Sequence, residues 1–478
     1  MPAKAKSKIR TRIAPSPTGP LHIGTARTAL FNYIFARKYK GDFILRIEDT
    51  DLERSDPIFE RDIEEGLKWL GIGRDEFYRQ SERLDIYEKY LKKLLDSGLI
   101  FWCYHSQEEL SAERQEQFSK KEAPKHYCSF RNDPPPKKED KKGILRFKND
   151  SSGDIIFNDL IRGKIAFDGR ALGDFSVAKD LKTPLYNFAV VIDDYEMKIS
   201  HVIRGEDHIS NTPKQILLQD ALNFNRPQYA HLPLILGTDR SKLSKRHGAT
   251  SLLEYKKSGY LPEAMINFMI LLGWHPAPPD SSGQKEKEIF TLNEMPKEFS
   301  LDRVQKGGAV FDIDKLKWLN GIYIKKLKTE DLALRLKDYA VDLTEDINSD
   351  PKKWLKVSGL LSERLTDLSE ARDMSEYFYK EPRYSKEILF WKKNQLSENI
   401  LRHLKHIHLV LSGVKKWEKR GLEAALTAYA AREGKGEVLW PLRAALSGRK
   451  ASAGPFEIAE VLGKEETIKR LKKAIDMF

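Results

Sequence analysis

The segment Ile9-Arg-Thr-Arg-Ile-Ala14, continued by Pro15-Ser-Pro-Thr-Gly-Pro-Leu-His22 and Ile23-Gly-Thr-Ala-Arg-Thr-Ala-Leu-Phe-Asn-Tyr-Ile34, decides the fold. Residues 9–14 have the length and pattern of a short strand, and prolines and a glycine then form a turn. Apolar residues next recur every three or four positions, which is typical of a helix. A second apolar run at 43–47 ends in Glu48. Strand, helix and strand in this order predict a parallel α/β unit, with ligands bound beyond the carboxyl ends of the strands.

The same α/β pattern returns between Asn187 and Leu236, with strand-like runs at 199–203 and 232–236. Between the two stretches, residues 105–150 contain a charged helix candidate at 108–121 and a Pro/Lys-rich loop at 133–142. This composition predicts an insertion that splits the α/β domain. From about residue 290 onward, helical periodicity dominates. We therefore expect a split α/β domain with a parallel sheet, followed by a helical region.

Composition narrows the class of protein. The chain has 478 residues, more than one hydrophobic core usually supports, so we expect two to four domains. Its net charge of +12 favours a polyanionic partner, although it also fits a basic soluble enzyme. With only Cys103 and Cys128, no disulfide framework is expected and a reducing compartment is favoured. No run approaches the roughly 18–20 apolar residues of a membrane helix, and no apolar signal segment follows the basic first residues, so we expect a cytoplasmic protein.

Two motifs carry candidate chemistry. His22 stands where a strand and turn give way to a helix, a place where free N–H groups and the helix dipole favour phosphate, and Gly24 leaves room for a nucleotide. The loop 236–248 places Lys242 and Lys245 after a strand, where cations can neutralise a triphosphate as pyrophosphate leaves. Taken singly, a lone helix-capping histidine and a solvated basic loop explain each motif as well. The P-loop and the G-x-G-x-x-G fingerprint are absent.

The two motifs together resemble the signatures of class I aminoacyl-tRNA synthetases. Within that class, Arg12-Ile-Ala-Pro-Ser-Pro-Thr-Gly19 and Leu45-Arg-Ile-Glu-Asp-Thr-Asp51 resemble the glutamyl and glutaminyl branch. Val202-Ile-Arg-Gly-Glu-Asp-His208, Pro184-Leu-Tyr-Asn-Phe-Ala189 and Pro441-Leu-Arg-Ala-Ala-Leu-Ser-Gly448 extend the likeness over nearly the whole chain. Glutaminyl and archaeal-type glutamyl enzymes carry C-terminal β-barrels, so the helical C-terminal pattern is similar to that of bacterial-type glutamyl-tRNA synthetases.

The resemblance implies a domain plan and a set of roles. The plan is a Rossmann-like catalytic domain at 1–104 and 187–245, split by an acceptor-binding insertion at 105–186, then a stem-contact helical domain at 246–329 and a helical anticodon-binding domain at 330–478. The implied glutamate-binding residues are Arg12, Ala14, Ser16, Glu48, Tyr186 and Arg204, unless Glu48 and Arg204 form only a structural ion-pair network. The implied ATP-binding residues are His22, Gly24, Thr25, Ser244 and Lys245, with His22, Lys242 and Lys245 as the catalytic set. Thr25 and Arg246 depart from the general class pattern, which leaves the role of Thr25 in doubt.

Cys103-Tyr-His105 and His126-Tyr-Cys128 form two pairs of soft ligands that suit tetrahedral Zn²⁺. Some members of the family carry zinc in this region, bound by a Cys-x-Cys pair and a later Cys. Here His105 replaces the second Cys, His126 lies on the opposite side of Cys128 from the usual last ligand, and Phe130 occupies that ligand's place. The alternative is two unrelated buried thiols with surface histidines.

The implied activity is that of a glutamate–tRNA ligase. It would activate L-glutamate with ATP and Mg²⁺ to glutamyl-adenylate, and transfer it to the 3′ terminal adenosine of tRNA(Glu), releasing AMP and pyrophosphate. Arg364, Arg443 and Arg449 are candidate tRNA contacts, although surface salt bridges explain each of them as well. A non-catalytic RNA-binding paralogue and a nucleotidyltransferase acting on a small molecule are the alternatives. The family suggests a monomer, and charging of tRNA(Gln) is left open.

Overall fold

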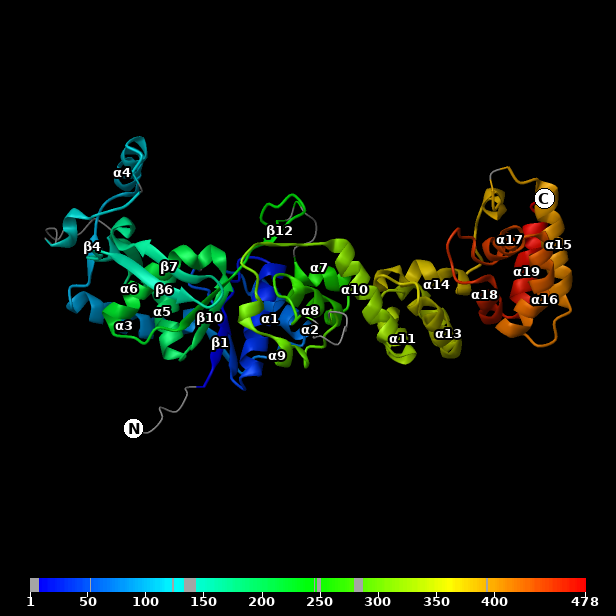
Figure 1. Cartoon of the computed structure of the whole chain (residues 1–478), viewed down its shortest axis with the longest axis horizontal. Coiled ribbons are helices and arrows are strands. Elements are labelled where there is room, and N and C mark those ends of the chain that lie inside the picture. Colours follow the sequence, from blue (N-terminus) through cyan, green and yellow to red (C-terminus); the bar gives the residue numbers. More distant parts are fainter. Residues whose placement is uncertain are drawn as a thin grey trace. The chain divides into compact units, whose positions relative to one another are not determined.

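The computed structural model describes residues 8–51, 53–122, 124–132, 143–244, 246, 251–278, 287–392 and 394–478 (Figure 1). The chain divides into two compact units: Met1–Tyr255 with Pro262–Ile313, called unit 1, and Lys256–Leu261 with Asp314–Phe478, called unit 2. Lys245 and the loop 133–142 lie outside the described residues.

A parallel sheet forms the centre of unit 1. The strands β1 (Arg10–Ile13), β2 (Asp42–Ile47) and β3 (Glu76–Arg79) pair in parallel, as do β10 (His201–Gly205) and β11 (Gln228–Leu232). The two groups meet where the N–H of Ser200 donates to the carbonyl oxygen of Arg10 at 2.9 Å. The resulting order β3-β2-β1-β10-β11 is that of a doubly wound nucleotide-binding fold, so the predicted fold class is confirmed.

Helix α1 (Ile23–Lys38) follows β1, as its apolar spacing predicts. Its residues Ile23, Leu30 and Ile34 are fully buried. Buried Asn32 donates from Nδ2 to the carbonyl oxygen of Ile203 at 2.9 Å, and its own carbonyl accepts from the hydroxyl of Thr11. These bonds fasten α1 to both halves of the sheet. The other helices of the α/β layers are α2 (Pro57–Trp69), α3 (Leu84–Asp96), α5 (Tyr186–Glu196) and α6 (Thr212–Leu222).

One predicted strand, 232–236, is interrupted. Strand β11 ends at Leu232, and β12 (Ile235–Leu236) pairs instead with β13 (Ala309–Val310). Pro233 lies between them and has no N–H to continue the ladder, which explains the break. The predicted strand 199–203 begins two residues later, at His201, and Ser200 before it already donates its N–H to Arg10 of β1.

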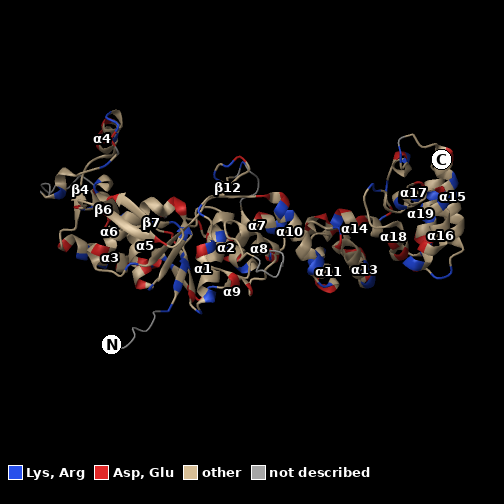
Figure 2. Cartoon of the chain, in the orientation of Figure 1, with Lys and Arg blue, Asp and Glu red and all other residues tan. Residues whose placement is uncertain are grey.

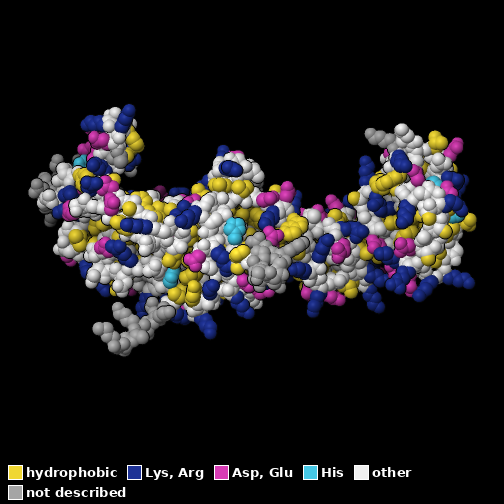
Figure 3. Space-filling model, viewed as in Figure 1, with side chains coloured by type: hydrophobic (Ala, Val, Ile, Leu, Met, Phe, Trp, Pro, Cys, Tyr) yellow, Lys and Arg dark blue, Asp and Glu magenta, His cyan; other side chains and the backbone are white. Residues whose placement is uncertain are grey.

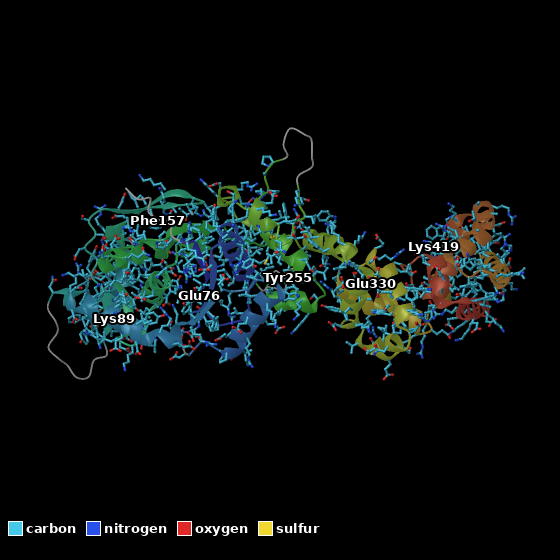
Figure 4. All side chains as sticks on the ribbon, turned by 90° about the horizontal axis from the view of Figure 1, so that it is seen from below. Glu76, Lys89, Phe157, Tyr255, Glu330 and Lys419 are labelled. Carbon is cyan, nitrogen blue, oxygen red and sulfur yellow. The ribbon has the colours of Figure 1, made fainter. Side chains whose placement is uncertain are left out.

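The inserted segment forms a second, antiparallel sheet. Its strands are β4 (Ile100–Cys103), β5 (Ile144–Phe147), β8 (Phe175–Asp180) and β9 (Thr183–Pro184). Strand β4 precedes residue 105, so this sheet extends beyond the segment 105–186. The hairpin β6 (Asp154–Asp159) and β7 (Gly163–Asp168) joins the central sheet where Asp159 pairs with Tyr229. Figure 4 labels Phe157 on β6 and Glu76 on β3. Helix α4 (Gln107–Ser119), predicted at 108–121, begins with a Ser106–Glu109 capping box and stands out from the rest of unit 1 in Figure 1.

Short helices complete unit 1, and the described residues of unit 2 form helices joined by loops, with no strand among them. After β12 come α7 (Leu252–Lys257), α8 (Pro262–Leu271) and α9 (Met295–Glu298). The later helices are α10 (Ile313–Lys326), α11 (Thr329–Lys337), α12 (Thr344–Ser349), α13 (Pro351–Ser362), α14 (Ala371–Tyr379), α15 (Ser397–Ser412), α16 (Lys419–Glu433), α17 (Lys435–Ser447), α18 (Pro455–Leu462) and α19 (Lys464–Ile475). Trp354 of α13 is 2 % exposed and donates to the carbonyl oxygen of Ala333 on α11. The predicted helical C-terminal region is confirmed.

Basic and acidic residues are interspersed along the ribbon of each unit (Figure 2), and side chains of both signs are spread over the face of each unit that Figure 3 shows. In the part of the chain that the structure describes, each helix is too short or too polar to cross a bilayer.

Candidate active site

A cavity of 720 Å³ opens at the carboxyl ends of β1, β2, β10 and β11, where the parallel sheet predicts a ligand site. Most of the predicted site residues line it: Arg12, Ala14, Ser16, His22, Gly24, Thr25, Glu48, Tyr186, Arg204 and Lys242. Ser244 is not among the lining residues, and Lys245 lies outside the described residues. The cavity thus brings together residues that are up to 230 positions apart in sequence, from Arg12 to Lys242.

His22 caps α1 in the wall of the cavity. The N–H of Gly24 donates to Nδ1 of His22 at 2.9 Å, so the neutral ring carries its proton on Nε2. Burial and the nearby Lys242 lower the pKa of His22, which favours this neutral form. A Cβ added at Gly24 would lie 3.2 Å from Nδ1, so any side chain there would press on the ring. His22 is therefore a preset N–H donor at a helix N-terminus.

Arg204, at the end of β10, is a buried arginine held from one side. Its Nε donates to Nε2 of His231 at 3.1 Å, and its Nη2 donates to the hydroxyl of Thr212 at 2.8 Å. Its Nη1 has no hydrogen-bond partner among the residues that the structure describes, and Arg204 is only 5 % exposed. Within the described residues, no carboxylate forms an ion pair with Arg204. A buried guanidinium in this state favours an anionic ligand, because the open donor and the unmatched charge are both costly.

His231 fixes the orientation of Arg204. Because Nε2 of His231 accepts from Arg204, Nδ1 carries the proton and donates to Asp159 at 2.6 Å. The N–H of His231 also donates to Asp159. Burial lowers the pKa of His231 despite the opposing effect of Asp159, so the ring stays neutral. The chain Asp159–His231–Arg204 therefore links the insertion to the floor of the cavity, a link that no sequence motif indicated.

Arg12 and Glu48 belong to an ion-pair network under the cavity. Arg12 donates to Asp194 at 3.1 and 3.5 Å, and fully buried Arg46 donates to Asp194 at 2.8 Å and to Glu48 at 3.0 Å. Burial alone would lower the pKa of Arg46, but its carboxylate neighbours raise it. For Glu48 the balance is opposite: burial raises its pKa beyond what Arg46 and Arg12 can offset. Glu48 belongs to the ion-pair network and also lines the cavity. A cation bound in the cavity would therefore stabilise its ionised carboxylate.

Several cavity residues escaped the sequence analysis. Arg27 is buried within α1, donates to the carbonyl oxygens of Leu272 and Pro233, and has its pKa lowered to about 10 by burial. Asp207, His208 and Asn211 follow β10 and also line the cavity. The sequence signal that could have identified these three residues is their position directly after the predicted strand that ends in Arg204. Asp207 lies 3.4 Å from Lys242, and burial with the charge of Arg204 lowers the pKa of His208 to about 4.

The predicted metal ligands Cys103, His105, His126 and Cys128 converge on one point of the insertion. Their ligand atoms all lie within 4.8 Å of one another. Sγ of Cys103 is 3.4 Å from Nδ1 of His105 and 3.7 Å from Nε2 of His126, and Sγ of Cys128 is 3.5 Å from Nδ1 of His105. Nδ1 of His126 faces a carboxylate oxygen of Glu113 on α4 at 2.6 Å. The Phe130 ring packs against His105 at a tilt of 54°, with ring centroids 4.9 Å apart, and contributes packing rather than a ligand.

The predicted tRNA contacts Arg364, Arg443 and Arg449 gather in one region of unit 2. The pKa of Arg443 is lowered by burial and by Arg364, and Arg364 and Arg449 both act on Tyr377. Arg364 lies 3.6 Å from Glu457, and Arg449 lies 3.5 Å from Glu376. Two of the three arginines therefore form the surface ion pairs that are the alternative to tRNA contact. These ion pairs do not decide between the two roles.

The chain matches known proteins over nearly its whole length. The family described as tRNA synthetases class I (E and Q), catalytic domain, matches residues 8–318, and an anticodon binding domain family matches residues 331–475. The glutamate–tRNA ligases of Carboxydothermus hydrogenoformans and Desulforamulus reducens are 43% and 42% identical, covering 97% and 98% of this chain and 99% of each relative. A crystal structure of a glutamate tRNA ligase from Elizabethkingia meningosepticum in complex with its amino acid superposes with a TM-score of 0.86 at 34% identity, covering 98% of this chain and 99% of that one.

Replacing His231 tests the orientation of Arg204. His231→Leu removes the acceptor of a bond from a charged donor, so we expect L-glutamate to bind about tenfold more weakly in titration calorimetry. The loss should be smaller for His231→Gln, which retains an acceptor. Wild-type affinity should also fall as the pH drops below the lowered pKa of His231, because a protonated Nε2 no longer accepts from Arg204. His201→Gln, on the other end of β10, is the control, and unchanged affinity in His231→Leu would contradict this role.

Proposed function

The chain belongs to the class I tRNA synthetases for glutamate and glutamine, and we propose that it is a glutamate–tRNA ligase whose cavity binds L-glutamate and ATP together. The observation that supports the choice of amino acid is Arg204, a residue of the cavity wall whose buried Nη1 has no hydrogen-bond partner among the described residues. A carboxylate side chain supplies the missing charge and acceptor, whereas the neutral amide of glutamine supplies the acceptor alone.

The cavity offers a place for each charged group of glutamate. Arg204 takes a carboxylate, with Arg12 adding positive charge from beside Asp194. Glu48 holds the ammonium group, with the hydroxyl of Ser16 as its neighbour in the wall and Ala14 and Tyr186 closing the pocket. The raised pKa of Glu48 supports this role, because an ammonium group stabilises the ionised carboxylate that burial disfavours.

The reaction needs no protein nucleophile. An oxygen of the glutamate α-carboxylate attacks the α-phosphate of ATP, pyrophosphate leaves, and a hydroxyl of the terminal adenosine of the tRNA then displaces AMP from the carbonyl carbon. Neutral His22 donates its Nε2 proton in a hydrogen bond to the phosphates, and Lys242 and Lys245 neutralise the charge that develops. Gly24 and Thr25 leave room for the nucleotide at the start of α1, and Ser244 belongs to the same basic loop. Positioning and electrostatics therefore supply the catalysis.

Mg²⁺ is the metal expected with ATP. It prefers oxygen ligands and is usually bound through substrate phosphates with one or two carboxylates. Asp207 is the cavity carboxylate closest to Lys242, and it would hold the ion beside the phosphates. Bound there, Mg²⁺ would offset phosphate charge during the transfer.

The Cys/His cluster fits Zn²⁺. Zinc–sulfur bonds of about 2.3 Å and zinc–nitrogen bonds of about 2.0–2.1 Å at tetrahedral angles place adjacent sulfur and nitrogen ligands about 3.6 Å apart. The three sulfur–nitrogen distances, 3.4, 3.5 and 3.7 Å, bracket that value. Glu113 would hold Nδ1–H of His126 and turn Nε2 toward the metal, as outer carboxylates commonly do. Zinc would tie strand β4 to the segment 126–128 and so stiffen the insertion.

The partners follow from the same proposal. The substrate RNA is tRNA(Glu), with residues 105–186 contacting its acceptor end, 246–329 its stem and 330–478 its anticodon, where Arg364, Arg443 and Arg449 gather. Two arginines of that group already have carboxylate neighbours, so a phosphate would have to compete with these ion pairs. We place the enzyme in the cytoplasm as a monomer, and tRNA(Gln) is a second candidate substrate.

The proposed activity is tested by charging purified tRNA(Glu) and tRNA(Gln) transcripts with radiolabelled glutamate, with glutamine as the control amino acid. We expect glutamate to be attached to tRNA(Glu) and glutamine to neither RNA. Arg204→Gln, which keeps donors but loses the charge, should lower kcat/KM for glutamate by about two orders of magnitude. Folded wild-type protein that charges neither RNA in the presence of ATP and Mg²⁺ would rule the proposal out.

The zinc proposal is tested by elemental analysis of the purified, untagged chain. We expect about one zinc per chain, and none in the double variant Cys103→Ser with Cys128→Ser. Glu113→Gln should weaken zinc binding about tenfold to a hundredfold in competition with a chelator. The exposed His275→Gln, outside the cluster, should keep its zinc, and a wild-type chain free of zinc after purification from zinc-supplemented medium would refute the site.

A further inference from the structure

The turn between β6 and β7 supports the wall of the cavity from behind. Oδ1 of Asp159 accepts from the N–H groups of Ile161 and Arg162, at 3.0 and 2.9 Å, and so fixes the shape of this turn. Its other oxygen, Oδ2, accepts from the N–H of His231 and from Nδ1 of the same residue. One buried carboxylate therefore holds both the turn and the hydrogen-bond chain to Arg204.

Arg162 extends from this turn to Glu206, which directly follows β10. Nη2 of Arg162 donates to Oε2 of Glu206 and, at 3.2 Å, to the carbonyl oxygen of Lys306. The other carboxylate oxygen, Oε1 of Glu206, accepts from the N–H of Leu234 at 2.7 Å. Leu234 is one of the described residues that line the cavity, and neither Arg162 nor Glu206 is among them. The ion pair thus lies behind the wall and would not touch a ligand.

Leu234 precedes the short strand that carries the basic loop. In strand β12, the carbonyl oxygen of Ile235 accepts from the N–H of Leu243 at 2.9 Å, so the loop folds back onto the strand that begins it. Leu236 of the same strand lies opposite Lys242 in an isolated β-bridge. Lys242 lines the cavity together with Leu234 and Ile235. The position of Lys242 therefore depends on the position of β12.

Strand β12 needs support from outside its own sheet. It pairs with β13 over only two residues of each strand, and a sheet of two short strands is marginally stable alone. Arg27 on α1 supports β12 through the carbonyl oxygen of Pro233. The ion pair supports both strands, since it holds Leu234 at the start of β12 and Lys306 just before β13. A break in the ion pair would therefore free both strands from the turn between β6 and β7.

We propose that Arg162 and Glu206 are positioning residues that hold β12 so that Lys242 faces the phosphates of ATP. The inference rests on the proposed function, because it takes the phosphates to bind beside Lys242. It gives the turn between β6 and β7 two tasks. The side chain of Asp159 orients Arg204 on the glutamate side of the cavity, and the side chain of Arg162 supports the phosphate side. Because different side chains perform the two tasks, a substitution can separate them.

A positioning role differs from a direct electrostatic effect on ATP. If the two residues acted only through their charges, loss of the positive charge of Arg162 would weaken binding of the anionic nucleotide. Loss of the negative charge of Glu206 would then strengthen it. If the two residues hold β12 as a pair, either loss breaks the same ion pair. Both substitutions then weaken ATP binding, and the sign of the Glu206 effect separates the two explanations.

The test is titration calorimetry of the full-length protein with ATP and Mg²⁺, and separately with L-glutamate. Arg162→Gln and Glu206→Gln should each weaken ATP binding about tenfold, the effect of losing one hydrogen bond between charged groups. Both should leave the affinity for L-glutamate unchanged, because Asp159 and His231 remain in place. Retained glutamate binding also shows that the variants fold. The double variant should bind ATP no more weakly than either single variant, since all three lose the same ion pair.

The control is Arg170→Gln, which removes an exposed ion pair with Asp168 at the other end of β7 and should preserve both affinities. Tighter ATP binding by Glu206→Gln would overturn the proposal in favour of a direct charge effect. Unchanged ATP binding in Arg162→Gln, or an equal loss of ATP and L-glutamate binding, would overturn it as well. Because the readout is ligand binding, it stays separate from charging: wild-type protein that binds ATP but charges no RNA would refute the ligase and not the positioning role.

Discussion

The proposed site in unit 1 depends on Arg204, which is buried and has no carboxylate partner among the described residues. A lone guanidinium in a protein interior is costly, so its position requires hydrogen bonds that hold it and a ligand that completes it. The chain supplies the first requirement through His231, Asp159 and Thr212. The second requirement, a ligand, is indicated by Nη1, which has no hydrogen-bond partner among the described residues. The buried Nη1, which has no partner among the described residues, supports our proposal that the cavity binds a negatively charged substrate.

The remaining buried charges hold the strand ends in place. Arg46 connects β2 to Asp193 and Asp194 on α5, and Asp193 in turn accepts hydrogen bonds from Gln80, Arg83 and Tyr87. Removing one member would leave an uncompensated buried charge, which typically costs about 3–5 kcal/mol. The network joins α5, which follows the insertion, to segments that precede the insertion, and so ties the two halves of the split domain together. Arg12 and Glu48 are members of this network and also line the cavity, so in the proposed site the same ion pairs support both folding and recognition.

Local sequence determined the features that could be predicted. Residues close together in sequence determine the strand, turn and helix at 9–38 and the position of His22 at the helix start. The two Cys/His pairs are likewise each only three residues long. Contacts between distant residues could not be predicted in this way. Arg12 and Asp194 are 182 positions apart, and Asp159 and His231 are 72 apart. No motif marks Asp159 or Glu113, since a single acidic residue becomes informative only when the fold places a partner beside it. The interruption of the strand at Pro233 could have been predicted from the sequence, because proline cannot continue a central strand.

The most direct test of the account is a crystal structure of the chain grown with L-glutamate. The account predicts a carboxylate oxygen of the ligand within hydrogen-bond distance of Nη1 of Arg204, with the ammonium group beside Glu48 and the Asp159–His231–Arg204 chain unchanged. A bound glutamate that leaves Nη1 unpaired, or that turns its ammonium group toward Arg204, would contradict it.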